Sequence, residues 1–143
     1  MKEFVVHVNF AGCKLLECGS KTMLYKTHSP SVQPPFKCYI CCHDVINPTI
    51  DIPHNWNKNV VGEFICDSYT VLNDDNVFEV AQKACLPEEF LEGRRGKAWN
   101  ISKVKFYNRP RSINDFFYFS EVLRRPEIVP TCRIPWHQVC FKI

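Results

Sequence analysis

The chain has 143 residues, of which 45% are hydrophobic and 23% charged, a balance typical of one globular domain and unlike that of a disordered segment. Its net charge of +3 permits an anionic partner without requiring one, and no apolar run reaches the length of a membrane span. The charged, alternating N-terminus predicts no signal peptide, so we expect a cytoplasmic protein, a single domain over residues 1–143 and reduced thiols at the nine cysteines.

The first half of the chain predicts short strands and one helix. A β-rich run over residues 4–8 precedes a helix over 10–18, which ends where Gly19 can adopt the left-handed conformation that closes helices. Strands are expected at 22–27 and 36–42, with a proline-broken loop between them and an irregular excursion over 43–58. Residues 60–67 form the strongest predicted strand, because their apolar and polar side chains separate by parity.

The second half predicts helices first and strands later. A helix follows the turn at 73–76, and a second short helix begins at Pro87 and ends at Gly93. A strand is expected over 96–107, then a helical piece capped at 112–115 that contains Phe116, Phe117, Phe119, Val122 and Leu123, and a closing strand over 139–143. Because no strand–long helix–strand unit is present, a small, mostly antiparallel barrel fits better than a parallel sheet.

Four segments, in this order, resemble motifs of one family. They are the helix–Gly–x–Lys–Thr element at 13–22, the strands at 35–41 and 61–67, and the Trp-x-Ile-Ser strand at 98–110. Together they resemble the small ASCH-domain proteins of the PUA-like superfamily, which are common in bacteria and their phages. The resemblance covers most of residues 4–118 and implies an α+β fold, a small mixed, mostly antiparallel β-barrel with short helices and a cleft between barrel and helix.

The resemblance also implies a function. Relatives bind RNA or modified nucleosides in that cleft, and some are hydrolases of acylated pyrimidine nucleosides in which the lysine after the glycine, here Lys21, is proposed as catalytic. This chain departs from the hydrolase pattern, because Leu24 replaces an assisting threonine and Gly12 replaces a common tryptophan. The leading hypothesis is therefore a binding module for RNA or a modified nucleoside, of bacterial or phage origin.

The predicted nucleic-acid contacts are mostly basic. Seven cations fall within residues 94–111 without one acidic residue, so an anionic backbone could bind there in a salt-sensitive way; a solvated face is the alternative. Strand parity would place Lys97, Lys103 and Lys105 on one face with Trp99, a candidate for base stacking that could equally pack in a core. Tyr25 and Trp56 are further aromatic candidates. The predicted contacts are Lys21, Lys26, Arg94, Arg95, Lys97, Trp99, Lys103 and Lys105.

Two other functions stay open. An amidohydrolase, or less readily a ribonuclease, would use Lys21 with a nearby acid, for which Glu63 and Glu89 are candidates by position. A phage-encoded scaffold for a protein partner, without catalysis, would be favoured by exposed apolar surface around residues 44–58. The sequence favours a binder over an enzyme.

Cysteine and histidine residues have the chemistry that zinc needs, at Cys13 and Cys18, at 38–43, and at Cys132, His137 and Cys140. Yet Cys38 and Cys41 lie within an apolar strand, where residues three apart point to opposite faces. We therefore predict no metal and no cofactor.

Overall fold

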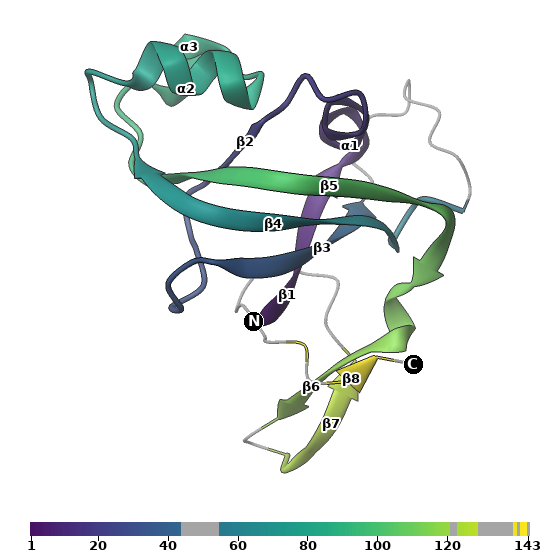
Figure 1. The fold of residues 1–143 in the computed structure, drawn as a ribbon. Helices are drawn as coiled ribbons and strands as arrows, with labels where there is room; N and C mark the ends of the chain where they lie inside the picture. Colours follow the sequence, from purple (N-terminus) through teal and green to yellow (C-terminus); the bar gives the residue numbers. More distant parts are fainter. Residues whose placement is uncertain (44–54, 121–122, 129–138, 140, 143) are drawn as a thin grey trace.

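The main sheet curls around the largest core. The structure, a computed structural model, describes residues 1–43, 55–120, 123–128, 139 and 141–142. Five strands form this sheet in the order β1–β3–β4–β5–β2, and only the β1–β3 pair is parallel (Figure 1). Their bounds are Glu3–Asn9 for β1, Met23–Lys26 for β2, Phe36–His43 for β3, Asn59–Val71 for β4 and Lys97–Ser112 for β5. The edge strands β1 and β2 do not pair with each other, so the barrel is open between them.

Three short helices accompany this sheet. Helix α1, Phe10–Glu17, follows β1 directly, and the Asn9 side chain caps it by accepting a hydrogen bond from the Gly12 amide at 2.7 Å. Helices α2, Val77–Ala84, and α3, Glu88–Leu91, connect β4 to β5 at one end of the sheet (Figure 1). Helix α2 buries Val80, Ala81 and Ala84, whose spacing follows the helical period.

The prediction of a helical piece after residue 112 is wrong for residues 116–120, and Val122 lies outside the described residues. One 3₁₀ turn, Ile113–Asp115, leads directly into strand β6, Phe116–Ser120, which forms a second sheet with β7, Arg125–Ile128, and β8, Phe141–Lys142. Aromatic side chains favour a pleated, half-buried surface over a helix, and here Phe116 is buried while Phe119 is exposed. Strand β8 lies within the predicted closing strand.

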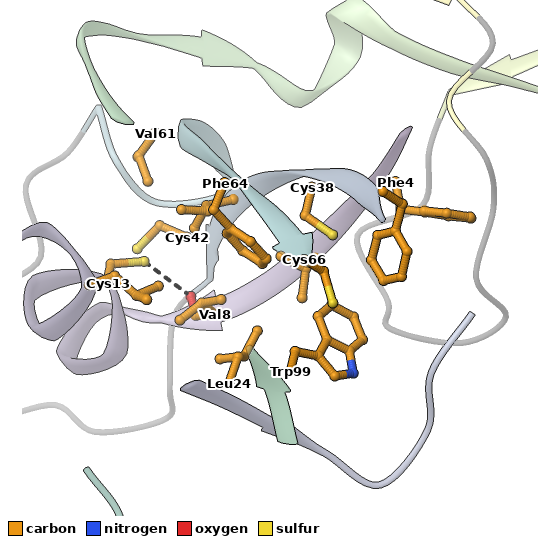
Figure 2. Close-up of a cluster of buried hydrophobic side chains, with 14 residues drawn as sticks. Phe4, Val8, Cys13, Leu24, Cys38, Cys42, Val61, Phe64, Cys66 and Trp99 are labelled. Carbon is orange, nitrogen blue, oxygen red and sulfur yellow. Dashed lines mark hydrogen bonds between the residues drawn. The ribbon is translucent and has the colours of Figure 1, made fainter. Parts of the chain in front are cut away.

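Three apolar clusters hold the described part of the chain together. The main core lies inside the curl and includes the buried thiols of Cys13, Cys38, Cys42 and Cys66 (Figure 2). A second cluster, with Tyr39 and Phe116, covers the other face of the sheet, and a third lies against α2. The seven cysteines within the described ranges carry free thiols, and those of the core behave as small apolar side chains.

Candidate functional site

A pocket of about 320 Å³ lies where the sheet stays open between β1 and β2. We call it the seam pocket; it is lined by residues 7–9, 12, 21, 24–27, 43, 86, 90 and 94. Its walls come from both edge strands, the end of β3, the first turn of α1 and the segment around α3. The family resemblance leads us to expect a cleft between barrel and helix, and the seam pocket is a hollow lined by both strands and helices.

Lys21 is a buried cation of this pocket. Gly19, with a φ of 82°, turns the chain out of α1, and the backbone amide of Lys21 then donates to the Leu15 carbonyl oxygen at 3.1 Å. The side chain is only 8% exposed, and its Nζ donates to the carbonyl oxygen of Ala84 at 2.6 Å. Burial lowers the pKa of this ammonium. Within the described ranges, Lys21 forms no salt bridge.

Two more cations line the pocket. The Nζ of Lys26, on β2, donates to the His7 carbonyl oxygen on β1 at 3.1 Å and so bridges the opening between the edge strands. The guanidinium of Arg94 lies 4.1 Å from the ring centroid of Phe90, and its Nε donates to the Phe90 carbonyl oxygen at 2.6 Å. No carboxylate side chain lines the seam pocket within the described residues, so its electrostatics favour an anionic group.

A second hollow of about 280 Å³ lies on another side of Lys21. Its other walls are mostly apolar and come from α1 and β5, with Ile101 and Phe106 among them. Glu17 also lines it, but this carboxylate is exposed and paired with Lys14 at 2.8 Å. Lys21 therefore borders two hollows. Among their described lining residues the only carboxylate is that of Glu17, which is paired with Lys14.

Neither predicted acidic partner lies beside Lys21. Glu63 is the cross-strand partner of Tyr39, whose side chain packs in the second cluster, so both point to the face of the sheet away from the main core. There Glu63 forms an ion pair with Lys37. Glu89 is exposed on α3 and does not line either hollow. Lys21 thus occupies a pocket, but its recorded partner is a backbone carbonyl.

Trp99 belongs to the core and presents no ring face for base stacking. Figure 2 shows Trp99 among the side chains of the main core. It is 0% exposed, its Nε1 donates to the Ser29 hydroxyl at 3.0 Å, and its ring meets Phe36 edge-on at 5.3 Å. Of the two roles that the sequence left open for Trp99, the structure shows core packing. Tyr25 does line the seam pocket, whereas Trp56 stacks on Phe106 outside it.

The predicted cationic face of β5 is not formed as strand parity suggested. Register shifts in the β4–β5 pairing break the alternation, and Lys103 has a φ of 52°. Lys103 and Lys105 are exposed, Lys97 lies over the Tyr69 ring at 4.6 Å, and Arg95 is exposed after α3. Of the eight predicted nucleic-acid contacts, the seam pocket contains Lys21, Lys26 and Arg94.

Sequence reasoning missed three ring-bearing residues of the pocket. His7 and His43 have ring centroids 6.2 Å apart, because the parallel register pairs β1 with β3. Phe90 is 43% exposed and meets Tyr25 edge-on. The only local signal for Phe90 was an aromatic residue four positions before Arg94. For the histidines the sequence held no local signal, because the pairing of distant strands brings them together.

The described residues include only some of the cysteines and histidines considered as zinc ligands. No group of three or more histidine, cysteine or acidic residues within the described ranges could hold a metal ion. Cys38 lies in the main core and Cys41 in the second cluster, as expected for residues on opposite faces. Cys132, His137, Cys140 and most of the segment 44–58 lie outside the described residues. Nor does any described helix combine the length and apolar character required to cross a bilayer.

Solved structures with a similar fold include ASCH proteins of Zymomonas mobilis. One has 18% identity and a TM-score of 0.58, covering 78% of this chain and 73% of that chain. A tyrosine-to-phenylalanine variant aligns with a TM-score of 0.59 at 18% identity, over 78% and 76% of the two chains. A serine-to-alanine variant aligns at 15% identity and a TM-score of 0.59, over 91% and 89%. No protein-family model and no curated protein matches the sequence. The chain has the α+β fold of ASCH domains, as its four motifs predict.

Proposed function

We propose that this ASCH-fold domain is a binding module for RNA or a modified nucleoside, and that the seam pocket is its binding site. The observation that carries the proposal is Lys21, a buried ammonium without a carboxylate partner within the described residues. A buried ion that lacks a counter-ion costs several kcal/mol, so a bound anion would offset much of that cost. Phosphate groups of nucleic acid are such anions.

The remaining walls suit a nucleobase. Phe90 and Tyr25 provide aromatic surface, while Val8, Leu24 and Leu86 provide apolar surface. Stacking of a base on an aromatic side chain contributes about 1–3 kcal/mol in single-strand binders. A pocket that combines aromatic walls with cations fits an unstacked nucleotide better than it fits a double helix, whose bases are not accessible in this way.

The test is fluorescence anisotropy of a labelled single-stranded RNA at two salt concentrations. Lys21→Met should weaken binding and reduce the slope of log affinity against log salt by about one. Lys83→Met makes the same chemical change at an exposed side chain that pairs with Glu79 and lines neither hollow, so it should bind as the wild type does. Equal affinity of both variants would refute the seam pocket as the binding site.

An amidohydrolase is the second candidate, favoured by one observation. The lowered pKa of Lys21 makes its amine easier to deprotonate, as a base or nucleophile requires. Against it, Leu24 occupies the wall where an assisting hydroxyl would be needed, and neither Glu63 nor Glu89 lines the pocket. Hydrolysis of the amide in an acylated pyrimidine nucleoside releases the carboxylic acid and the unacylated nucleoside. Formation of both products, abolished by Lys21→Met, would establish the enzyme, and no turnover would leave the binding module.

A further inference from the structure

We propose that the seam pocket selects one nucleotide unit with a terminal phosphate monoester over a neutral nucleoside or an internal phosphodiester. This inference rests on the proposed function and deepens it by naming the ligand class. The pocket contains three cationic side chains, Lys21, Lys26 and Arg94, and its described lining has no carboxylate. A terminal monoester carries a charge near −1.5 to −2 at neutral pH, whereas a phosphodiester carries −1 and a nucleoside none.

Lys21 determines where the phosphate would bind. An ammonium has three donors, and the recorded bond to the Ala84 carbonyl oxygen uses one of them. This bond holds the Nζ in position before any ligand arrives, so less rotamer freedom remains to be lost on binding. A neutral nucleoside would displace water from this ammonium without supplying a charge, which is why we expect it to bind weakly.

Lys26 and Arg94 bring positive charge to the pocket from other elements. Lys26 extends from β2 to the β1 backbone, and Arg94 follows α3, so with Lys21 the cations come from three separate segments. A monoester presents three terminal oxygens, which can accept hydrogen bonds from donors on several sides. A diester has only two such oxygens, because its other two are esterified to carbon. The arrangement therefore favours a chain end or a mononucleotide over the middle of a strand.

The size of the pocket also favours a single nucleotide over a longer strand. A volume of about 320 Å³ is near the lower end for small-molecule sites, which span roughly 300–1,000 Å³. One nucleotide is the unit that such a volume suits. Phe90 is 43% exposed, lines the pocket and belongs to α3, whereas Lys21 follows α1, so the base and the phosphate would contact different elements.

Isothermal titration calorimetry on the full chain tests the inference with five probes at one pH and low salt. They are cytidine, cytidine 5′-monophosphate, the cytidylyl-cytidine dinucleotide with and without a 5′-terminal phosphate, and inorganic phosphate. We expect the two probes with a terminal monoester to bind roughly 10- to 100-fold more tightly than cytidine and the unphosphorylated dinucleotide, the gain of a charge-assisted hydrogen bond. Inorganic phosphate should bind more weakly than the mononucleotide, because it lacks the base.

Variants assign the preference to the site. In Lys21→Met, the monophosphate and the nucleoside should bind with affinities within about threefold of each other, whereas Lys83→Met should retain the full preference. Lys26→Met is a second pocket variant in case Lys21→Met does not fold, and circular dichroism checks each fold. If Lys26→Met retains the full preference, the inference is wrong.

The outcomes separate this inference from the proposed function. Equal affinity for the two dinucleotides would overturn the terminal-phosphate preference while leaving nucleotide binding in place. Inorganic phosphate binding as tightly as the mononucleotide would make this a simple phosphate site and overturn the nucleotide assignment. If no probe binds and single-stranded RNA also fails in the anisotropy assay, both proposals are refuted.

Discussion

The ammonium of Lys21 donates a hydrogen bond to the carbonyl oxygen of Ala84 at 2.6 Å, across 63 positions of sequence. Ala84 is the last residue of α2, and the neighbouring Lys83 carbonyl accepts from the Thr22 amide at 2.9 Å. The turn that follows α1 is thereby tied to the C-terminus of α2, where the helix dipole favours a positive charge. This contact places a cation in the seam pocket, whose described lining contains no carboxylate.

Replacing Lys21 should affect binding far more than stability. Lys21→Met loses one hydrogen bond, worth about 0.5–1.5 kcal/mol, but also removes the desolvation of a buried charge, so we expect the free energy of unfolding to change by less than about 2 kcal/mol. Urea denaturation measures this change. A loss well above that value would show that Lys21 mainly holds the two helices together, and the binding argument would then lose its basis.

Trp99→Ala should destabilise the fold by about 3–5 kcal/mol, because it removes a fully buried ring from the main core. Trp99→Phe keeps an aromatic ring and should cost less, while losing the bond to Ser29. Thermal unfolding compares the two variants. The binding affinity of folded Trp99→Phe should match that of the wild type; a marked loss would indicate that the indole contacts the ligand after all.

Cys18 should be the most reactive described cysteine. Its thiol is exposed, and hydrogen bonding to Ser20 lowers its pKa, so more thiolate is present at neutral pH than in an ordinary cysteine. Burial raises the pKa of Cys38, which should remain unmodified in the folded protein. Limited alkylation followed by peptide mass mapping tests the order. Ser20→Ala should slow the modification of Cys18, and an unchanged rate would refute the role of the hydroxyl.

The buried thiols should make the fold sensitive to alkali. Burial raises the pKa values of Cys41 and Cys66 to about 12, from an ordinary value near 9. Between these pH values the unfolded chain has lost these protons and the folded chain keeps them, so the free energy of unfolding must fall as pH rises from about 9 to 12. Urea titrations across this range should show a shallower fall for Cys66→Ala than for the wild type, and parallel curves would contradict this linkage.

Local patterns predicted much of the fold. The helix that ends at Gly19, the strand around Val60–Phe64 and the helix with Val80 and Ala84 all form, because period and capping act over a few residues. The four family motifs likewise predicted the ASCH fold. The segment 116–120 was misassigned because its phenylalanines fit a short helix and a strand alike, and pairing with β7 and β8 decides for the strand.

The sequence by itself therefore determined most of the elements before residue 112, the ASCH fold and Lys21 as a residue of interest. Only the tertiary structure decided which residues meet. The pairing of β1 with β3 and of β2 with β5 leaves a pocket between two unpaired edges, and it places Glu63 on the face of the sheet away from the main core. Strand register depends on contacts between distant segments and on bulges such as those in β4–β5, which no local periodicity encodes.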